Sequence, residues 1–129
     1  MKNKQIIGDP IVINGRTLSL SKAIRAGDFI FLTGQVPMKD GKVVVDGSIE
    51  DQTVIVLEEI KDTLKLAGCD LKDVVKAMVW LRDKEDFPGF NTVYGKYFPE
   101  EPPVRSAVVN TLLVDVRVEI EVIAFKPVK

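Results

Sequence analysis

The sequence predicts a domain of the α/β class, of the α+β type, in which one mixed β-sheet of about six strands carries two helices on one face. Two segments repeat apolar residues at the three- and four-residue spacing of amphipathic helices. The other apolar segments are short, rich in Val, Ile and aromatic residues, and bounded by turn residues, which is typical of strands. The predicted order along the chain is β-β-β-α-β-α-β-β, which favours a mixed sheet.

The N-terminal third of the chain supplies the first strands. We expect Ile11–Ile13 and Thr17–Ile24 to form a hairpin, because Asn14-Gly15 between them is a favoured two-residue turn. Phe29–Thr33 is the next expected strand. The segment Lys39–Lys42 contains an Asp-Gly pair and is expected to be an exposed loop.

Two segments are expected to be helices that pack on the sheet. The first begins near Ser48, where Ser-Ile-Glu-Asp resembles a capping box, and ends at Gly68. The apolar residues on one face of this helix are Leu57, Ile60, Leu64 and Ala67. The second helix runs from about Asp86 to Phe98 and is stopped by Pro99.

The remaining strands are expected at Val74–Leu81, Val104–Val109 and Val116–Phe125. Along the last strand the even-numbered positions are apolar, whereas Glu119 and Glu121 lie on the opposite face. The helices should therefore cover the apolar face of this strand.

The face of the sheet that no helix covers is expected to be apolar as well. The residues that indicate this are Val75, Ala77, Val79, Leu81, Ala107 and Val109. An apolar face of this kind is normally buried against another subunit. The sequence therefore predicts a homo-oligomer with clefts where its subunits meet.

Composition limits the class of protein. A chain of 129 residues with 46% hydrophobic and 29% charged residues fits one globular domain over residues 1–129. No apolar run approaches the ~20 residues of a membrane span, and the N-terminal residues contain no secretory h-region, so we expect a cytoplasmic protein with no membrane partner. The net charge of −1 and the scattered Lys and Arg residues disfavour nucleic-acid binding.

Two features of the side-chain inventory limit the chemistry. Cys69 is the only cysteine, which excludes an internal disulfide and a cysteine-rich metal cage. The chain contains no histidine, so it lacks the usual general base of Ser/His hydrolases and the commonest metal ligand. Carboxylates, Arg, Lys, Tyr and backbone amides remain as candidate catalytic groups.

Arg105 stands at the start of one expected strand, and Glu119 and Glu121 lie on the next. If these strands form a hairpin centred near Leu113, Arg105 lies across from Glu121, and Ala107 across from Glu119. A cation and two carboxylates on one sheet face can hold a substrate carboxylate while a glutamate positions or deprotonates water. An ordinary cross-strand ion pair has the same spacing, so the residues alone leave both interpretations open.

Four segments occur in the order and with the spacing of the motifs of one known family. They are Thr33-Gly34-Gln35-Val36-Pro37; Ala67-Gly68-Cys69-Asp70 with Asp73-Val74-Val75-Lys76; Asp86-Phe87 with Phe90-Asn91-Thr92-Val93-Tyr94; and Pro103-Val104-Arg105-Ser106 with Val118-Glu119-Ile120-Glu121-Val122-Ile123-Ala124. Together they extend over about residues 25–126. By these motifs the chain is identified as a member of the RidA (YjgF) reactive-intermediate deaminase family.

The resemblance implies a chorismate-mutase-like fold and a homotrimer with three pockets between subunits. Arg105 matches the family arginine that grips the substrate carboxylate, and Glu119 matches the glutamate that orients the attacking water. Thr33, Gly34 and Asn91 match residues that line the substrate pocket. The implied reaction needs no cofactor and no metal: an enamine such as 2-aminoacrylate becomes an imine, water adds to its carbon, and ammonia leaves a 2-oxo acid.

Two positions depart from the family pattern. Leu20 stands where many active members carry a pocket tyrosine, and Ala107 stands where a cysteine is frequent. The carboxylate clamp is intact, but two alternatives stay open: a pathway deaminase for a larger substrate such as 2-aminomuconate, and a non-catalytic module that binds a small carboxylate or another protein. The ribonuclease role ascribed to the family is disfavoured by the missing histidines and the pI near 5.5. Glu119 and Glu121 point the same way on an ideal strand, so the sequence does not decide which of them faces the pocket.

Overall fold

A mixed sheet of six strands forms the centre of the computed structural model, which describes residues 3–128. In spatial order its strands are β1 (Lys4–Ile7), β4 (Ala23–Ala26), β5 (Phe29–Leu32), β10 (Val118–Phe125), β8 (Val74–Leu81) and β9 (Val104–Val109). Neighbouring strands are antiparallel except β8 and β9, which run parallel. The predicted class, a mixed sheet of about six strands, is confirmed.

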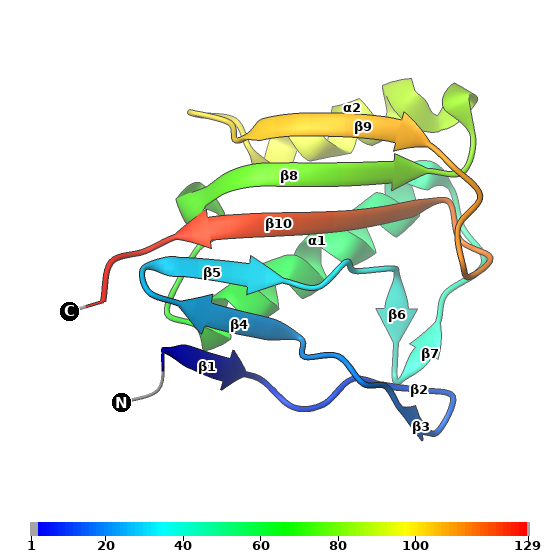
Figure 1. Ribbon diagram of the computed structural model, residues 1–129. Helices are drawn as coiled ribbons and strands as arrows, with labels where there is room; N and C mark the ends of the chain where they lie inside the picture. Colours follow the sequence, from blue (N-terminus) through cyan, green and yellow to red (C-terminus); the bar gives the residue numbers. More distant parts are fainter. Residues whose placement is uncertain (1–2, 129) are drawn as a thin grey trace.

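Two helices, α1 (Ile49–Leu66) and α2 (Phe87–Tyr97), lie on one face of this sheet (Figure 1). The Ser48 hydroxyl accepts a hydrogen bond from the Asp51 amide at 3.1 Å and so caps α1 at its predicted start. Short 3-10 turns at Leu71–Asp73 and Lys84–Asp86 lead into β8 and α2. Both helices are therefore found where the sequence predicts them.

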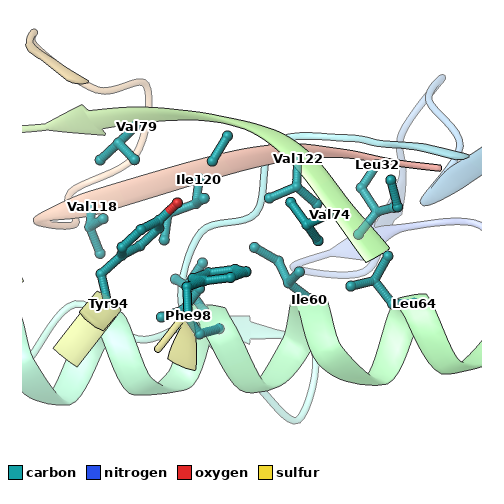
Figure 2. Close-up of a cluster of buried hydrophobic side chains, with 14 of the residues drawn as sticks. Leu32, Ile60, Leu64, Val74, Val79, Tyr94, Phe98, Val118, Ile120 and Val122 are labelled. Atoms are coloured by element: carbon teal, nitrogen blue, oxygen red, sulfur yellow. The ribbon is translucent and has the colours of Figure 1, made fainter. Parts of the chain in front are cut away.

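The hydrophobic core fills the space between these helices and the sheet (Figure 2). The even-numbered positions of β10 face inward, and Val118, Ile120 and Val122 are all buried. Figure 2 shows them over residues from both helices, which include Ile60 of α1 and Tyr94 of α2. Because each fully buried large apolar side chain stabilises the fold by roughly 1.5–3 kcal/mol, this layer fixes which face of β10 points toward the helices.

The N-terminal hairpin is shorter than predicted. The strands β2 (Val12–Ile13) and β3 (Arg16–Thr17) pair across Asn14-Gly15, whose φ angles of 51° and 77° are those of the expected tight turn. The expected strand Thr17–Ile24 is wrong, because the chain leaves the hairpin after β3 and enters the main sheet only at Ala23, between β1 and β5. Strand β1 was not predicted.

A second small hairpin joins β6 (Met38–Lys39) to β7 (Lys42–Val43). Its turn residues Asp40 and Gly41 have positive φ angles of 53° and 77°. The expected exposed loop at Lys39–Lys42 is therefore the tip of a hairpin.

The predicted hairpin of β9 and β10 is wrong. Strand β8 lies between them: it is joined to β9 through α2 and runs parallel to it, while β10 inserts between β5 and β8. The connection from β8 to β9 is a helical crossover, which is the usual connection between parallel neighbouring strands. Strand β9 forms the edge of the sheet beyond β8. The register therefore pairs Arg105 with Ala77 and not with Glu121. Ala107 likewise pairs with Val79, while Glu119 pairs with Trp80.

The face of the sheet opposite the helices is apolar, as predicted, although other residues make it so. Ala77, Val79 and Leu81 are buried on the helix side. On the open face, the side chains of Phe29, Phe31 and Phe125 are 42%, 44% and 41% exposed. Ile123, Met78 and Trp80 belong to the same face by register. A broad apolar surface is left without a covering layer within the described chain.

Candidate functional site

Arg105 is held against helix α2 at the edge of the sheet. Its Nη1 donates a hydrogen bond to Asn91 Oδ1 at 2.9 Å. Its guanidinium carbon lies 4.8, 5.6 and 5.7 Å from the ring centroids of Tyr94, Phe90 and Phe87. These aromatic residues share one face of α2 because they are three and four positions apart. Each ring presents its negative face to the cation.

The Arg105 guanidinium forms no ion pair with an acidic side chain of the described residues. Within residues 3–128, no carboxylate oxygen lies within 4.0 Å of its nitrogens. A guanidinium carries five N–H donors, and the structure shows one of them bonded to a side chain, that of Asn91. The partly buried cation therefore keeps the capacity to bind a carboxylate through two parallel hydrogen bonds.

A cavity of about 200 Å³ shares Phe87 with the aromatic set around Arg105, although Arg105 itself is not among its lining residues. Its lining residues are Leu81, Lys84, Phe87, Ala107, Val108 and Val109. The walls are apolar apart from Lys84, so the cavity suits the carbon skeleton of a small acid whose carboxylate is held at Arg105.

Glu119 forms a second cluster on the open face of the sheet. It lines a hollow of about 200 Å³ together with Trp80 and residues 110–113. Burial, and then the nearby charge of Glu121, raise the pKa of the Glu119 carboxyl above its ordinary value. A carboxylate of this kind is a better proton acceptor than an ordinary surface glutamate.

The backbone at Gly34 lies directly against the Glu119 carboxylate. A β-carbon at position 34 would collide with Glu119 Oε2, so any larger residue there would displace the Glu119 carboxylate from its present place. Thr33 precedes this glycine at the end of β5. Glu121 is exposed and does not line the hollow, so Glu119 is the glutamate that this geometry selects.

The structure brings the predicted site residues together in two groups. Arg105 contacts Asn91 on the helix side of the sheet, and Gly34 contacts Glu119 on the open side, with Thr33 adjoining. The two groups lie on opposite faces, with β8 between the strands that carry Arg105 and Glu119. The sequence reasoning missed the aromatic residues around Arg105 and the position of Trp80 beside Glu119. The helical spacing of Phe87, Phe90 and Tyr94 was the available signal.

The two departures from the family pattern fall in different places. Ala107 lines the cavity that includes Phe87 and contributes only a methyl group. Leu20 is 41% exposed and lines a separate hollow near residues 6–10. Neither residue supplies a polar atom to the two groups described above.

The described part of the chain contains no cluster of three or more His, Cys, Asp or Glu side chains that could hold a metal ion. Cys69 is buried and free, and burial raises the pKa of its thiol, which keeps it in the unreactive protonated form. Between residues 3 and 128 no helix has the length and apolar character needed to cross a membrane.

A six-stranded mixed sheet with both helices on one face, an arginine at its edge and a glutamate on its open face defines a class of small α+β proteins. Residues 16–126 match the family model described as endoribonuclease L-PSP. The chain therefore belongs to this family, which confirms the predicted membership of the RidA (YjgF) group.

Individual relatives support this assignment. A RutC family protein of Pyrococcus horikoshii is 50% identical over 109 residues, which cover 82% of this chain and 86% of the relative. The chloroplastic Reactive Intermediate Deaminase A of Arabidopsis thaliana is 41% identical over 107 residues, or 81% of this chain and 57% of that protein. The crystal structure of yeast Mmf1 has a TM-score of 0.86 and 33% identity, and the match covers 95% of this chain and 98% of that one.

Proposed function

We propose that the protein hydrolyses small carboxylated enamines and imines to 2-oxo acids and ammonia. The observation that carries the proposal is the Arg105 guanidinium, which is held by Asn91 and three aromatic rings and lacks an acidic partner within the described residues. One of these rings, Phe87, also lines a cavity. Such a guanidinium binds a carboxylate in a fixed orientation. The 41% identity to a protein named Reactive Intermediate Deaminase A supports the same activity.

In this proposal the working site forms between copies of the chain. Arg105 and Glu119 lie on opposite faces of one sheet, so a small substrate cannot touch both within a single copy. The apolar open face that carries Glu119 supplies the surface for association. We infer a homotrimer in which Arg105 of one copy faces Glu119 of its neighbour, with Thr33, Gly34 and Asn91 around the substrate.

The chemistry requires positioning and one proton acceptor. The terminal carbon of the enamine double bond takes up a proton, and the adjacent carbon, which bears the nitrogen, becomes the iminium carbon while Arg105 holds the neighbouring carboxylate. Glu119 accepts a proton from water as the water oxygen bonds to that carbon, and the amino group then leaves as ammonia when the carbonyl forms. The iminium is electrophilic already, so correct orientation and modest acid–base help are sufficient.

The test is ammonia release from imines that an L-amino-acid oxidase generates in situ, measured above the uncatalysed hydrolysis. Arg105→Ala should lower kcat/KM by about a hundredfold or more, because the carboxylate loses its charged hydrogen bonds. Arg16→Ala, in the exposed β2–β3 hairpin, is the matched control and should keep full activity. Undiminished turnover in Arg105→Ala would remove the mechanism.

A carboxylate-binding module without catalysis is the rival, and the apolar residues Leu20 and Ala107 favour it because they add no polar atom to the site. Thermal stabilisation by 2-oxo acids without deaminase activity on any imine would select it. A larger substrate such as 2-aminomuconate would instead show as activity on that compound alone. A ribonuclease is disfavoured by the net charge of −1 and the absence of histidine.

A further inference from the structure

A third cavity, of about 330 Å³, lies between helix α1 and the N-terminal half of the chain. Neither Arg105 nor Glu119 belongs to its lining. A water molecule takes up about 30 Å³ of liquid, so this space corresponds to about ten waters and is large enough for a small organic ligand.

Glu59 of α1 lines this cavity, and only one of its two carboxylate oxygens is hydrogen-bonded. Its Oε1 accepts a hydrogen bond from the Met38 amide at 2.7 Å, whereas Oε2 is buried and has no hydrogen-bond partner among the described residues. Burial raises the pKa of this carboxyl to about 7. Near neutral pH, a buried oxygen therefore lacks a hydrogen-bond partner in either protonation state of Glu59.

Other residues of the cavity lining offer donors that are also unused. Gln35 is only 9% exposed, and its buried Nε2 has no hydrogen-bond partner in the part of the chain that the structure describes. The charge of Lys22 is close enough to lower the pKa of Glu59, yet within residues 3–128 Lys22 forms no ion pair shorter than 4.0 Å. Lys22 and Glu59 therefore both line the cavity without forming an ion pair with each other.

The acidic groups and the donors of the lining come from different elements. Glu59 and Asp62 are three residues apart on α1 and supply the acidic groups. Lys22 and Gln35, which flank strands β4 and β5, supply the donors. Lys39 and Asp40 of the β6–β7 hairpin also line the cavity, and their opposite charges offset each other. A ligand that fits must carry a donor cation at one end and an acceptor anion at the other.

We propose that this cavity binds a free α-amino acid as a zwitterion, separately from the proposed catalytic site. The ammonium group donates to Glu59 Oε2, and the carboxylate accepts hydrogen bonds from Gln35 Nε2 and Lys22 Nζ. This occupant satisfies both orphaned atoms and places each of its charges beside the opposite charge of the protein.

The proposed binding of the amino acid should become tighter as the pH rises from 6 to 8. The ammonium group requires the ionised form of Glu59, which shares the cavity lining with Lys22, Asp62, Lys39 and Asp40. Since only the ionised fraction binds, the apparent affinity should be about tenfold weaker at pH 6 than at pH 8.

The test is titration calorimetry of the full chain with each of the twenty L-amino acids, in the wild type and in Arg105→Ala. At least one should bind equally well to both proteins, while the amine lacking its carboxylate and the acid lacking its amino group bind at least about tenfold more weakly. Glu59→Gln, which keeps an acceptor for Met38, and Lys22→Met, which keeps the aliphatic stem, should each weaken binding at least about tenfold. Lys65→Met, outside the cavity on α1, is the control and should change nothing.

Three results overturn the proposal: no amino acid binds the folded protein, binding disappears in Arg105→Ala, or folded Glu59→Gln and Lys22→Met bind as tightly as the wild type. Circular dichroism of each variant establishes folding, so a failure of binding is distinct from a failure to fold. Deaminase activity is not a readout here, so the result does not depend on the proposed function.

Discussion

Arg105 and Glu119 project from opposite faces of one sheet, separated by strand β8. The register pairs Arg105 with Ala77 and Glu119 with Trp80, and these two partners are an odd number of positions apart on β8. Ala77 is fully buried beneath the helices, whereas Trp80 belongs to the open face. Under the proposed function, association of copies is therefore a requirement of activity and not only of stability.

Mixing two inactive variants tests this requirement directly. Arg105→Ala and Glu119→Gln chains should each be inactive alone, but co-refolded in equal amounts they should regain about a quarter of wild-type activity, because each shared site draws the two residues from different copies. Ammonia release is the measurement, and each variant co-refolded with itself is the control. If the mixture stays inactive although mixed oligomers form, the two residues do not share a site.

A charge on the open face should separate the copies. Phe31→Lys places an ammonium among Phe29, Ile24 and Ile123 by register, and burying it against a second copy would be unfavourable. Sedimentation should show the wild type at three times the chain mass of 14.3 kDa and the variant at the chain mass, with deaminase activity lost. Val54→Lys, exposed on α1, is the control and should leave the oligomer intact. A monomeric wild type would contradict the proposed assembly.

The elements that local sequence patterns specify were predicted well. Helix α1 begins beside Ser48, because this residue caps it, and β8 and β9 have the predicted bounds. Strand β1 was not predicted, because four residues at a sheet edge next to Gly8 carry too short a pattern. The short connection between β9 and β10 led to the expectation that these two strands form a hairpin. Strand β9 instead pairs with β8, to which the helical crossover joins it.

The sequence predicted which residues belong to the site but not on which face of the sheet each of them lies. Motif spacing indicated Arg105, Asn91, Gly34 and Glu119, and the structure forms two contacting pairs from them. Their division between two faces depends on the strand order, which no residue near Arg105 specifies. Glu119 and Glu121 share one face of β10, but only Glu119 is half-buried and lines the hollow with residues 110–113.

Gly34→Ala should damage activity through Glu119. The new methyl group would collide with the Glu119 carboxylate and displace it, so kcat should fall by about a hundredfold, as for a misplaced catalytic group. Gly95→Ala in α2 is the control, since the new methyl group would meet no atom of the described chain within 4 Å and alanine is the better helix former. Similar kcat values for Gly34→Ala and the wild type would show that the close approach has no catalytic role.

Glu121 should set the acidic limit of the activity. Its carboxylate raises the pKa of Glu119, so removing that charge in Glu121→Gln should lower this pKa. The acidic limb of the kcat/KM profile should then move to lower pH, by less than about one unit for an exposed neighbour. Glu85→Gln, in the exposed 3-10 turn before α2 and outside the lining of the Glu119 hollow, should leave the profile unchanged. If the acidic limb of the kcat/KM profile does not move in Glu121→Gln, the ionisation of Glu119 does not control this limb.

Glu59 should make the fold less stable as pH rises. The folded protein holds the Glu59 proton up to a pKa of about 7, whereas the ordinary value is 4.5, so between these values the native state binds more protons than the unfolded state. Stability must then fall as pH rises through this window, and the loss is complete above it. Glu59→Gln removes the buried charge and keeps the acceptor for the Met38 amide.

The variant should therefore be more stable than the wild type at pH 8, by about 1 kcal/mol once solvent screening of this partly buried group is included, and equal to it at pH 4. Urea unfolding at a fixed protein concentration, which holds any oligomer equilibrium constant, measures both differences. Glu85→Gln should be neutral at both pH values because its side chain is exposed. If Glu59→Gln raises the free energy of unfolding by the same amount at pH 4 and at pH 8, the stabilisation comes from packing and not from removing the charge of this carboxylate.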